Sequence, residues 1–160
     1  MTVESLPQVL VQHPLKGVTR LVLNKHSSFN ALSTEMLQAL SEALSKASAQ
    51  EDCRVLVIAA EGKAFSTGHD LREMRANPSH DFYVSLFEKC SRMMLMLQAL
   101  PQPVIAQVQG IATAAGCQLV SMCDLAVASE QSRFAVSGIQ FGLFCSTPSV
   151  GLSRAVSRKK

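Results

Sequence analysis

Two segments of the chain carry small residues and glycine in a pattern that could hold a developing negative charge. Residues 63–71 (KAFSTGHDL) follow an apolar run that ends at Ala60, and residues 109–119 (QGIATAAGCQL) follow a second apolar run. Small residues with a glycine at the end of a strand let backbone N–H groups point into a cleft. One N–H from each segment would together make a two-donor site for an oxyanion.

The second segment is expected to open a helix near residues 114–116. The first N–H groups of a helix have no partner within the helix and lie at its positive dipole end, so they suit an anion. The same spacing also fits two tight turns whose small residues let a strand and a helix pack closely. Taken by themselves, the residues favour this structural interpretation over a site.

Few side chains near these segments could move a proton. His69 adjoins the first segment's donors and titrates near neutral pH, so it is a candidate acid or base; the alternative is a loop histidine that only packs. Asp70 could simply cap the turn at residues 71–75. Cys117 and Cys145 have no histidine near them in the sequence and are expected to be packing residues rather than nucleophiles.

The elements that would position these segments alternate between strand and helix. Strands are expected at residues 9–12, 19–23, 55–60, 104–108, 125–128 and 134–136, and helices at 33–49, 81–100, 113–122 and from about Pro148. The first two strands form a hairpin across a turn at residues 14–17. The alternation predicts an α/β layer fold with largely parallel strands. A strand–turn–helix unit recurs after Val55, which indicates a spiral-like internal repeat.

Composition fits one domain over residues 1–160 and excludes several classes of function. The chain has 160 residues, of which 48% are apolar and 17% charged, so it can build a core and is not expected to be disordered. The most apolar long stretch, residues 111–128, is interrupted by polar residues and glycine, so no membrane span is expected. With a net charge of +3, one Tyr and no Trp, the chain lacks a basic stripe and a stacking surface, which excludes nucleic acid as a partner.

The five cysteines include no Cys-x-x-Cys pair, and the four histidines lack metal-ligand spacing. This pattern indicates buried free thiols in a reducing compartment, and no metal site is expected. The N-terminus, with Glu4 and two prolines around a short apolar patch, resembles neither a signal peptide nor a transit peptide. The cytoplasm is therefore the expected location.

Several motifs, taken in order along the chain, resemble the crotonase (enoyl-CoA hydratase/isomerase) superfamily. They are Asn24 with residues 30–32 (NAL), residues 64–71 (AFSTGHDL), Gly110 with residues 115–119 (AGCQL), and residues 123–128 (CDLAVA). The match runs from about Val18 to the end, and the ordered set is specific although no single motif is. The His69-Asp70 pair and residues 142–148 look closest to one subgroup of the superfamily.

The resemblance implies a crotonase-like spiral of ββα repeats that binds acyl-CoA thioesters and stabilises a thioester enolate, as in a lyase of fatty-acid metabolism. By motif position, the two oxyanion-hole donors are the N–H groups of Thr67 and Ala115. The implied acyl-CoA contacts are Lys25, Ser28, Phe29, Asn30, Ala31, Thr67, Gly68, His69, Asp70, Ala115 and Gly116. Coenzyme A is part of the substrate, and no separate cofactor is implied. A solvated surface lysine is the alternative for Lys25 as a phosphate partner.

The same resemblance indicates that both catalytic carboxylates of the hydratases are replaced. One glutamate position holds Gln118 and the other holds Gly138, and Ser146 stands where some relatives carry an aspartate. Hydration of an enoyl thioester needs one group to activate water and another to move a proton. Glutamine and glycine supply neither, so standard two-glutamate hydration is not expected, and His69 or Asp70 is the candidate substitute.

Three functions stay open from the sequence. The chain could be a hydratase/isomerase-type enzyme with altered chemistry, a non-catalytic acyl-CoA binder or modulator, or a fragment with little function of its own. The third arises because residues 150–156 are amphipathic and the chain stops soon after them, so the C-terminal helical trimerisation region of the family is expected to be missing. A homotrimer or hexamer is expected of a full-length chain but not of this one, and apolar surface is expected to be exposed.

Overall fold

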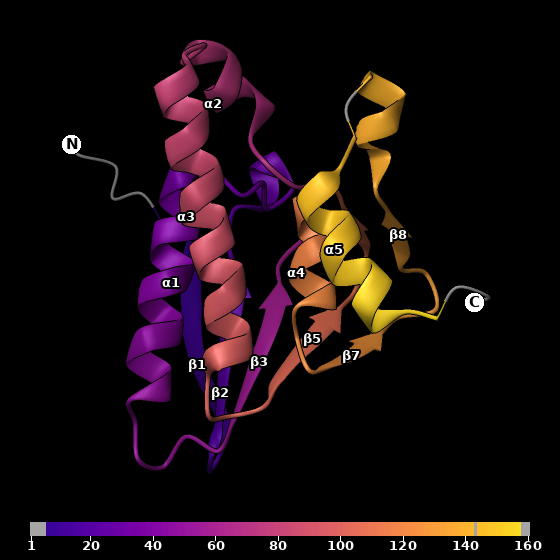
Figure 1. Cartoon of the computed structure of the whole chain (residues 1–160). Helices are drawn as coiled ribbons and strands as arrows, with labels where there is room; N and C mark the ends of the chain where they lie inside the picture. Colours follow the sequence, from indigo (N-terminus) through magenta and orange to yellow (C-terminus); the bar gives the residue numbers. More distant parts are fainter. Residues whose placement is uncertain (1–5, 143, 158–160) are drawn as a thin grey trace.

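The computed structural model describes residues 6–142 and 144–157, which form two sheets flanked by helices (Figure 1). The strands are β1 (Val9–Leu15), β2 (Val18–Leu23), β3 (Val55–Ala60), β4 (Ala64–Ser66), β5 (Val104–Val108), β6 (Ile111–Thr113), β7 (Leu125–Ala128) and β8 (Arg133–Ala135). The helices are α1 (Thr34–Ser48), α2 (Leu71–Ala76), α3 (His80–Ala99), α4 (Ala115–Ser121) and α5 (Ser146–Ala155), with 3-10 turns η1 (His26–Ser28) and η2 (Ser137–Phe141).

The larger sheet has the strand order β1-β2-β3-β5-β7, and the smaller sheet has the order β4-β6-β8. β1 and β2 pair antiparallel, and the other paired strands are parallel. Parallel strands need long crossover connections, which α1 provides from β2 to β3, and α2 and α3 provide from β3 to β5. The strand–strand–helix unit then repeats as β5-β6-α4. The predicted α/β fold with a ββα repeat and largely parallel strands is confirmed.

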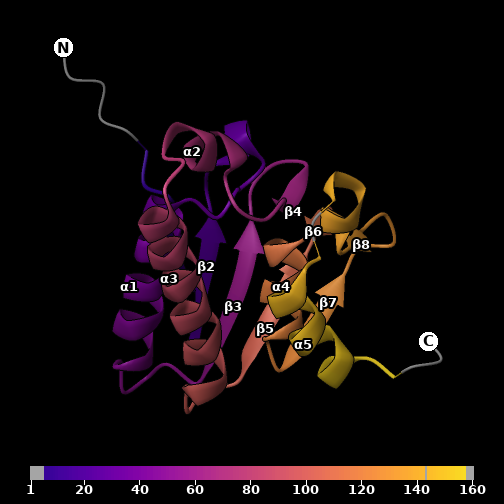
Figure 2. The ribbon, with the colours of Figure 1, turned by 45° about the horizontal axis from the view of Figure 1, so that its top comes forward.

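α1 and α3 lie side by side over one face of the larger sheet (Figures 1 and 2). α1 begins after Ser33, whose Oγ accepts a hydrogen bond from the Met36 N–H at 3.2 Å, as the sequence predicts. Buried side chains of the two helices and the sheet form one core that includes Leu37, Leu40, Leu44, Leu86, Met93, Leu97, Leu21, Leu56, Ile58 and Val104. Burial of this apolar surface is the main force that holds the helices on the sheet.

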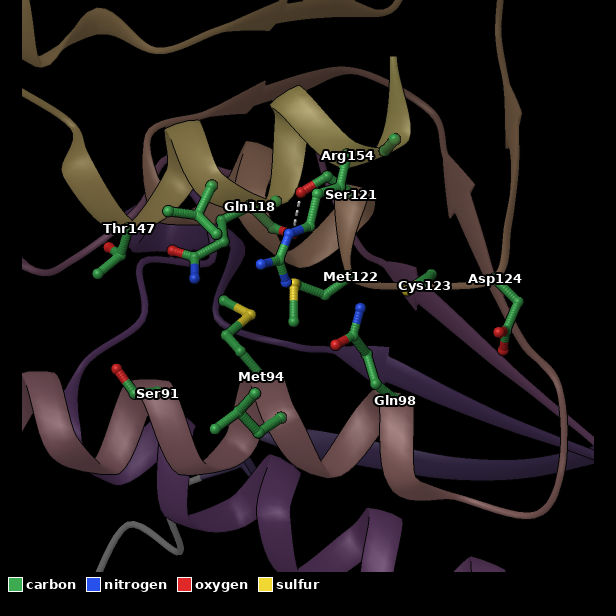
Figure 3. Close-up of a pocket in the computed structure, with 14 residues that line it drawn as sticks. Ser91, Met94, Gln98, Gln118, Ser121, Met122, Cys123, Asp124, Thr147 and Arg154 are labelled. Atoms are coloured by element: carbon green, nitrogen blue, oxygen red, sulfur yellow. Dashed lines mark hydrogen bonds between the residues drawn. The ribbon is translucent and has the colours of Figure 1, made fainter. Parts of the chain in front are cut away.

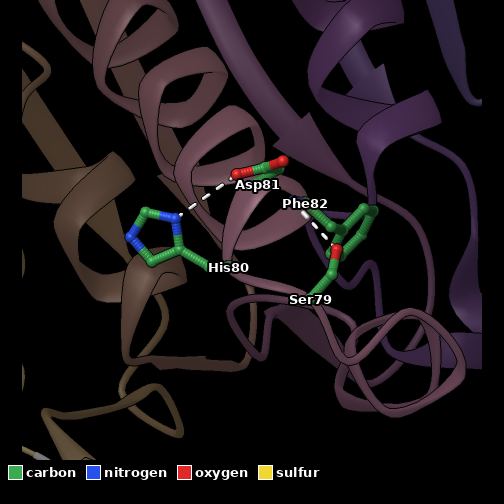
Figure 4. A network of polar contacts seen from close by, with 4 residues as sticks. All are labelled: Ser79, His80, Asp81 and Phe82. Carbon is green, nitrogen blue, oxygen red and sulfur yellow. Dashed lines mark hydrogen bonds and ion pairs between the residues drawn. The ribbon is translucent and has the colours of Figure 1, made fainter.

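The N-terminus of α3 is set by a capping serine (Figure 4). Ser79 Oγ accepts from the Phe82 N–H at 3.2 Å. Asp81 lies in the first turn, where the helix dipole favours a negative charge, and meets His80 at 3.4 Å in a fully exposed pair that contributes little to stability. α3 ends just before Leu100, whose extended backbone suits the proline that follows it.

Several segments differ from the sequence-based predictions. β1 continues to Leu15, so the turn expected at residues 14–17 is shorter, and the short strands β4 and β6 are not among the expected strands. The helix expected at residues 113–122 begins at Ala115, because Thr113 is the last residue of β6 and pairs with Ala135 of β8. The helix expected from about Pro148 begins at Ser146, and a proline in the first turn is tolerated because its missing N–H would have no partner there. The loop expected after residue 136 contains the 3-10 turn η2.

Apolar side chains are exposed around β7 and the segments that follow it. β7 is the last strand of the larger sheet, and all four of its residues are exposed. Leu125, Val127, Ile139 and Phe144 each keep more than half of their surface accessible. Exposed apolar surface is therefore present, as expected. Of the helices described, none combines the length and the apolar composition that crossing a bilayer requires.

Candidate functional site

The two glycine-containing segments found in the sequence lie against each other. β4 and β6 pair in parallel with Ser66 opposite Ala112, so the residues that follow the two strands leave the smaller sheet together. The Thr113 hydroxyl donates to the Thr67 carbonyl oxygen at 3.3 Å. Any side chain at residue 116 would clash with the Ser66 carbonyl, so glycine is required for this close approach.

The N–H groups of Thr67 and Ala115 are the candidate donors at this junction. Thr67 directly follows β4, and Ala115 is the first residue of α4. Among the described residues, no turn, loop or cap hydrogen bond uses either N–H. A Cβ atom built on Gly68 would lie only 3.2 Å from the Ala115 nitrogen, which measures how closely the segments approach. Two backbone donors from distant parts of the chain therefore share one region.

Ala114 has a backbone conformation that alanine rarely adopts. Its φ is 49° and its ψ is −124°, a region that glycine occupies far more readily. The Ala114 N–H donates to the Ala135 carbonyl at 2.9 Å, and the Ala114 carbonyl accepts from the Gln118 N–H at 3.0 Å. β8 and α4 thus hold this strained residue from both sides, and its conformation sets the direction of the Ala115 N–H.

Asn30 fastens the loop before α1 to the first segment. It is fully buried with a φ of 52°. Its Oδ1 accepts from the Lys25 N–H at 2.8 Å, and its Nδ2 donates to the carbonyls of Glu61 and Ala64 at 2.8 and 2.9 Å. Its own carbonyl accepts from the Ser66 hydroxyl at 2.8 Å. Every polar group of the side chain is therefore used to hold the loop.

Further hydrogen bonds bring the remainder of that loop to the same place. The Leu32 N–H donates to the Gly68 carbonyl at 2.7 Å, and the Thr67 hydroxyl donates to the Phe29 carbonyl at 3.5 Å. Phe29 is mostly exposed, whereas Ala31 is buried. The residues that the sequence singled out in 25–31 and in 67–70 are thus adjacent in the fold.

His69 lies beside this junction and is partly buried. Its Nδ1 is 3.3 Å from the Leu32 carbonyl oxygen, and its ring meets Phe87 edge-on with the centroids 5.2 Å apart. Because a carbonyl can only accept, this contact assigns the proton of the neutral ring to Nδ1 and leaves Nε2 as the basic nitrogen. Burial lowers the pKa of His69, against weaker opposing effects of the Leu32 carbonyl and the Glu73 carboxylate. His69 is therefore neutral at physiological pH.

The carboxylates near His69 are engaged with backbone groups. Asp70 caps α2 by accepting from the Arg72 and Glu73 N–H groups at 2.9 and 3.2 Å, which confirms the capping alternative for this residue. Glu73 Oε2 accepts from the Thr34 N–H at 2.9 Å, at the start of α1. Both carboxylates therefore stabilise helix termini.

Gln118 lies one helical turn after Ala115 and lines a cavity of about 480 Å³ between α3, α4 and α5 (Figure 3). Only 6% of the residue is exposed, and its Oε1 has no hydrogen-bond partner in the described part of the chain. Asp124 also borders the cavity, but its Oδ2 accepts from the Val104 N–H at 2.7 Å. Gly138 lies in η2, three residues after Ala135, the residue whose carbonyl holds Ala114.

The cysteines show no sign of activation. All five are free, and Cys53, Cys90 and Cys117 are buried, which confirms the prediction of free thiols, most of them buried. Burial raises the pKa of Cys90 to about 11 and that of Cys123 to about 12, so both stay protonated near neutral pH. The described residues contain no group of three or more His, Cys, Asp or Glu side chains that could hold a metal ion.

Comparison with known proteins identifies the family. The sequence model of the enoyl-CoA hydratase/isomerase family matches residues 15–160, so the chain belongs to this family. The mitochondrial enoyl-CoA hydratase domain-containing protein 3 of Xenopus laevis is 50% identical over 143 residues, which are 89% of this chain and 49% of that protein. The human protein of the same name is 46% identical over 156 residues, 98% of this chain and 52% of its own length. These relatives confirm the subgroup that the sequence indicated.

Solved structures agree with this assignment. An enoyl-CoA hydratase of Mycobacterium smegmatis superposes with a TM-score of 0.92 at 59% identity, covering 96% of this chain and 60% of that one. The structure of human enoyl-CoA hydratase domain-containing protein 3 gives a TM-score of 0.90 at 45% identity, with coverages of 95% and 60%. The chain spans about half the length of the curated relatives it matches.

Two features of the site are not evident from the sequence. The Ala114 strain is hidden because the residue type does not reveal the sign of φ, and alanine is a strong helix former. The role of the Asn30 side chain depends on carbonyls that lie more than 30 residues away in the sequence. In the local sequence, the burial of Asn30 is indicated only by its neighbours, one apolar and one small.

Proposed function

We propose that this chain binds acyl-CoA thioesters and polarises the thioester carbonyl with the N–H groups of Thr67 and Ala115. The observation that carries the proposal is the convergence of the two segments, with both N–H groups unused by turns, loops and caps. Two backbone donors at one oxygen stabilise the charge that an enolate places there, and fixed donors in a partly buried site do so better than water. Coenzyme A enters as part of the ligand.

The loop at residues 25–31 is the proposed contact surface for the coenzyme, together with residues 67–70. Asn30 and Leu32 hold this loop against Gly68 and Ser66, so a ligand at the donors would meet it. Lys25 supplies a positive charge for a phosphate. A loop that is already held in place binds with a smaller loss of conformational entropy than a free one.

Gln118 and Gly138 argue against two-carboxylate hydration as the reaction. Neither side chain can accept a proton, and the nearby acids Asp70, Glu73 and Asp124 accept backbone hydrogen bonds. His69, with its Nε2 free to act as a base, is the one group proposed to move a proton. A non-catalytic binder that keeps the two donors is the second candidate, and it is favoured if His69 cannot reach the α-carbon of the ligand.

A proline at residue 115 tests the donor directly. Proline is tolerated at the first position of a helix and has no N–H, so Ala115→Pro removes one donor. Because the residue before a proline favours an extended backbone and Ala114 is not extended, unchanged binding of free coenzyme A serves as the check that the loops are intact. The matched control is His80→Pro, which places proline at the first position of α3, after Ser79 in an extended backbone that suits a residue before proline.

Calorimetric titration with butyryl-CoA and with free coenzyme A gives the readout. We expect Ala115→Pro to weaken butyryl-CoA binding about tenfold and to leave coenzyme A binding unchanged, since only the acyl compound has the carbonyl. His80→Pro is expected to bind both as the original chain does. Undiminished butyryl-CoA affinity in a folded Ala115→Pro variant, or no affinity in the original chain, would overturn the proposal.

A further inference from the structure

Helices α4 and α5 pack closely against each other and run in the same direction. A Cβ atom built on Gly151 of α5 would lie only 2.6 Å from the Ser121 Oγ of α4, so glycine is required for this close approach. In Figure 3 Thr147, near the start of α5, lies beside Gln118. Arg154, near the end of α5, lies beside Ser121 at the end of α4. The N-termini of the two helices are therefore neighbours.

This register brings two cysteines to the same end of the helix pair. Cys117 lies one turn before Ser121 and shares its face of α4, the face that Gly151 contacts. Cys145 is the residue that precedes the first turn of α5. Side chains on a helix lean toward its N-terminus, so the Cys117 sulfur is directed toward the level of Cys145.

The two thiols differ in their access to solvent. Cys145 is partly exposed, whereas Cys117 is buried with 3% of its surface accessible. Burial raises the pKa of Cys117, the Ala135 backbone opposes this rise, and the charge of a Cys145 thiolate adds to it, which agrees with two neighbouring sulfur atoms. Cys117 is thus protonated near neutral pH and shielded from solution, so an oxidant meets Cys145 first.

We infer that Cys117 and Cys145 form a reversible disulfide bond when the chain meets a hydroperoxide. In the first step the peroxide transfers one oxygen atom to the Cys145 sulfur, which becomes a sulfenic acid, and hydrogen peroxide thereby leaves as water. In the second step the Cys117 sulfur attacks the Cys145 sulfur, the S–O bond breaks, and the oxygen leaves as water with the Cys117 proton. The two thiols together lose two electrons to the peroxide. A dithiol such as dithiothreitol reverses the bond by exchange.

The disulfide would stabilise the C-terminal part of the fold. It closes a loop of roughly 30 residues that contains β7 and β8, and such a cross-link restricts the unfolded chain more than the folded one. It also fixes the start of α5 to α4, the helix that begins at Ala115. No ligand takes part in the two steps, so the inference is independent of the proposed function.

Peptide mapping tests the inference. The folded chain, kept dilute, would be treated with hydrogen peroxide, blocked with N-ethylmaleimide and digested with trypsin without reduction. We expect a bond between the tryptic peptides 93–133, which contains Cys117, and 134–154, which contains Cys145. Cys145→Ser should abolish this bond. Cys123→Ser is the matched control and should keep it, because Cys123 lies in the same peptide as Cys117 and is partly exposed as Cys145 is.

Thermal denaturation gives a second measurement. The oxidised chain should unfold at a temperature about 5 °C higher than the reduced chain, and dithiothreitol should remove this difference. No linked peptides from the folded chain, a bond of Cys145 to Cys123, or a bond between two separate chains would each overturn the inference. Mapping of the original chain needs no variant, so it decides the matter even if Cys145→Ser does not fold.

Discussion

At the scale of single residues, Asn30 is the side chain on which the site loop depends most. Two of its three side-chain hydrogen bonds join segments that are more than 30 residues apart in the sequence, and the residue itself is fully buried. Removal of this side chain leaves the Lys25 N–H and the Glu61 carbonyl without partners, whereas the Ala64 carbonyl still accepts from Gln109 Nε2 at 3.2 Å. Asn also tolerates a positive φ better than most residues. Asparagine therefore suits this position both by its hydrogen bonds and by its backbone conformation.

Asn30→Ala is therefore expected to lower the free energy of unfolding by about 2 kcal/mol, since each of the two unsatisfied groups costs roughly 1 kcal/mol or more. Denaturation in urea measures the change. Asn77→Ala is the control, because the exposed Asn77 amide makes a single bond to the Glu73 carbonyl, and its loss should cost well under about 1 kcal/mol. Equal effects of the two substitutions would show that the Asn30 bonds do not hold the loop.

His69 gives a second prediction at this scale, which concerns pH. Burial lowers its pKa in the folded chain, whereas unfolding restores it to about 6.5. Between these two values the unfolded chain binds more protons, so the stabilising effect of neutral His69 is present above the unfolded pKa and is lost as the pH falls. The free energy of unfolding should decrease as the pH falls below about 6.5, and His69→Gln should flatten that decrease. The exposed His80→Gln variant should keep the original slope; a His69→Gln profile equal to it would refute the assignment.

At the scale of elements, the junction between β6 and α4 carries the strain of the site. Ala114 holds a conformation that costs roughly 1–3 kcal/mol for a residue with a Cβ. Glycine accepts the same φ and ψ without that cost, although it loses more entropy on folding. Relief of the backbone strain and the added loss of entropy have opposite effects on the free energy of unfolding, and we expect the relief of strain to be the larger.

Ala114→Gly is accordingly expected to raise the free energy of unfolding by about 1 kcal/mol. The same substitution within α1, Ala39→Gly, should lower it by about 1 kcal/mol, because a regular helix gives glycine no compensation. Thermal or urea denaturation of the pair compares the signs directly. If Ala114→Gly destabilises the chain as much as Ala39→Gly does, the Ala114 backbone is not strained.

The elements also explain how much of the fold the sequence predicts. α1 is recognisable because its capping serine and its apolar spacing extend over 15 residues, and β3 and β5 are recognisable as apolar runs. β4 and β6 have three residues each, too few for alternation to appear, and their pairing depends on segments more than 40 residues apart. The predicted start of α4 is wrong for this reason, since Thr113 belongs to β6.

The candidate site is predicted in part for a related reason. Its backbone donors follow two strands of one parallel array, so the order of the motifs places them at the same end of the sheet. The cavity beside Gln118 is different, because three helices build it and α5 contributes residues that no local pattern links to Gln118. Contacts between helices depend on tertiary packing, which single-sequence patterns do not record.

At the scale of the whole molecule, the chain exposes apolar surface at the β7 edge of the larger sheet. It spans about half the length of its curated relatives, and β7 leaves an open sheet edge with Leu125 and Val127 exposed. Unpaired edge strands with apolar side chains promote association between chains. We expect the 160-residue chain to self-associate at micromolar concentration.

Replacement of Val127 and Ile139 by serine should reduce that self-association, because both side chains are more than half exposed. Sedimentation velocity across a concentration series measures it. Val84→Ser, which changes an exposed valine on α3 instead, should leave the association unchanged. A monodisperse monomer in the original chain would contradict the prediction.

Two backbone N–H groups are proposed to donate hydrogen bonds to one thioester carbonyl, and the vibrational frequency of that carbonyl reports these bonds most directly. Isotope-edited infrared spectra of butyryl-CoA labelled with carbon-13 at the carbonyl would be recorded in water, with the original chain and with Ala115→Pro. Strong donors lower the stretching frequency of a carbonyl because they draw charge onto its oxygen. The account predicts a band below the value in water for the original chain, and a band closer to that value for Ala115→Pro. A bound ligand whose carbonyl band stays at its value in water would contradict the account.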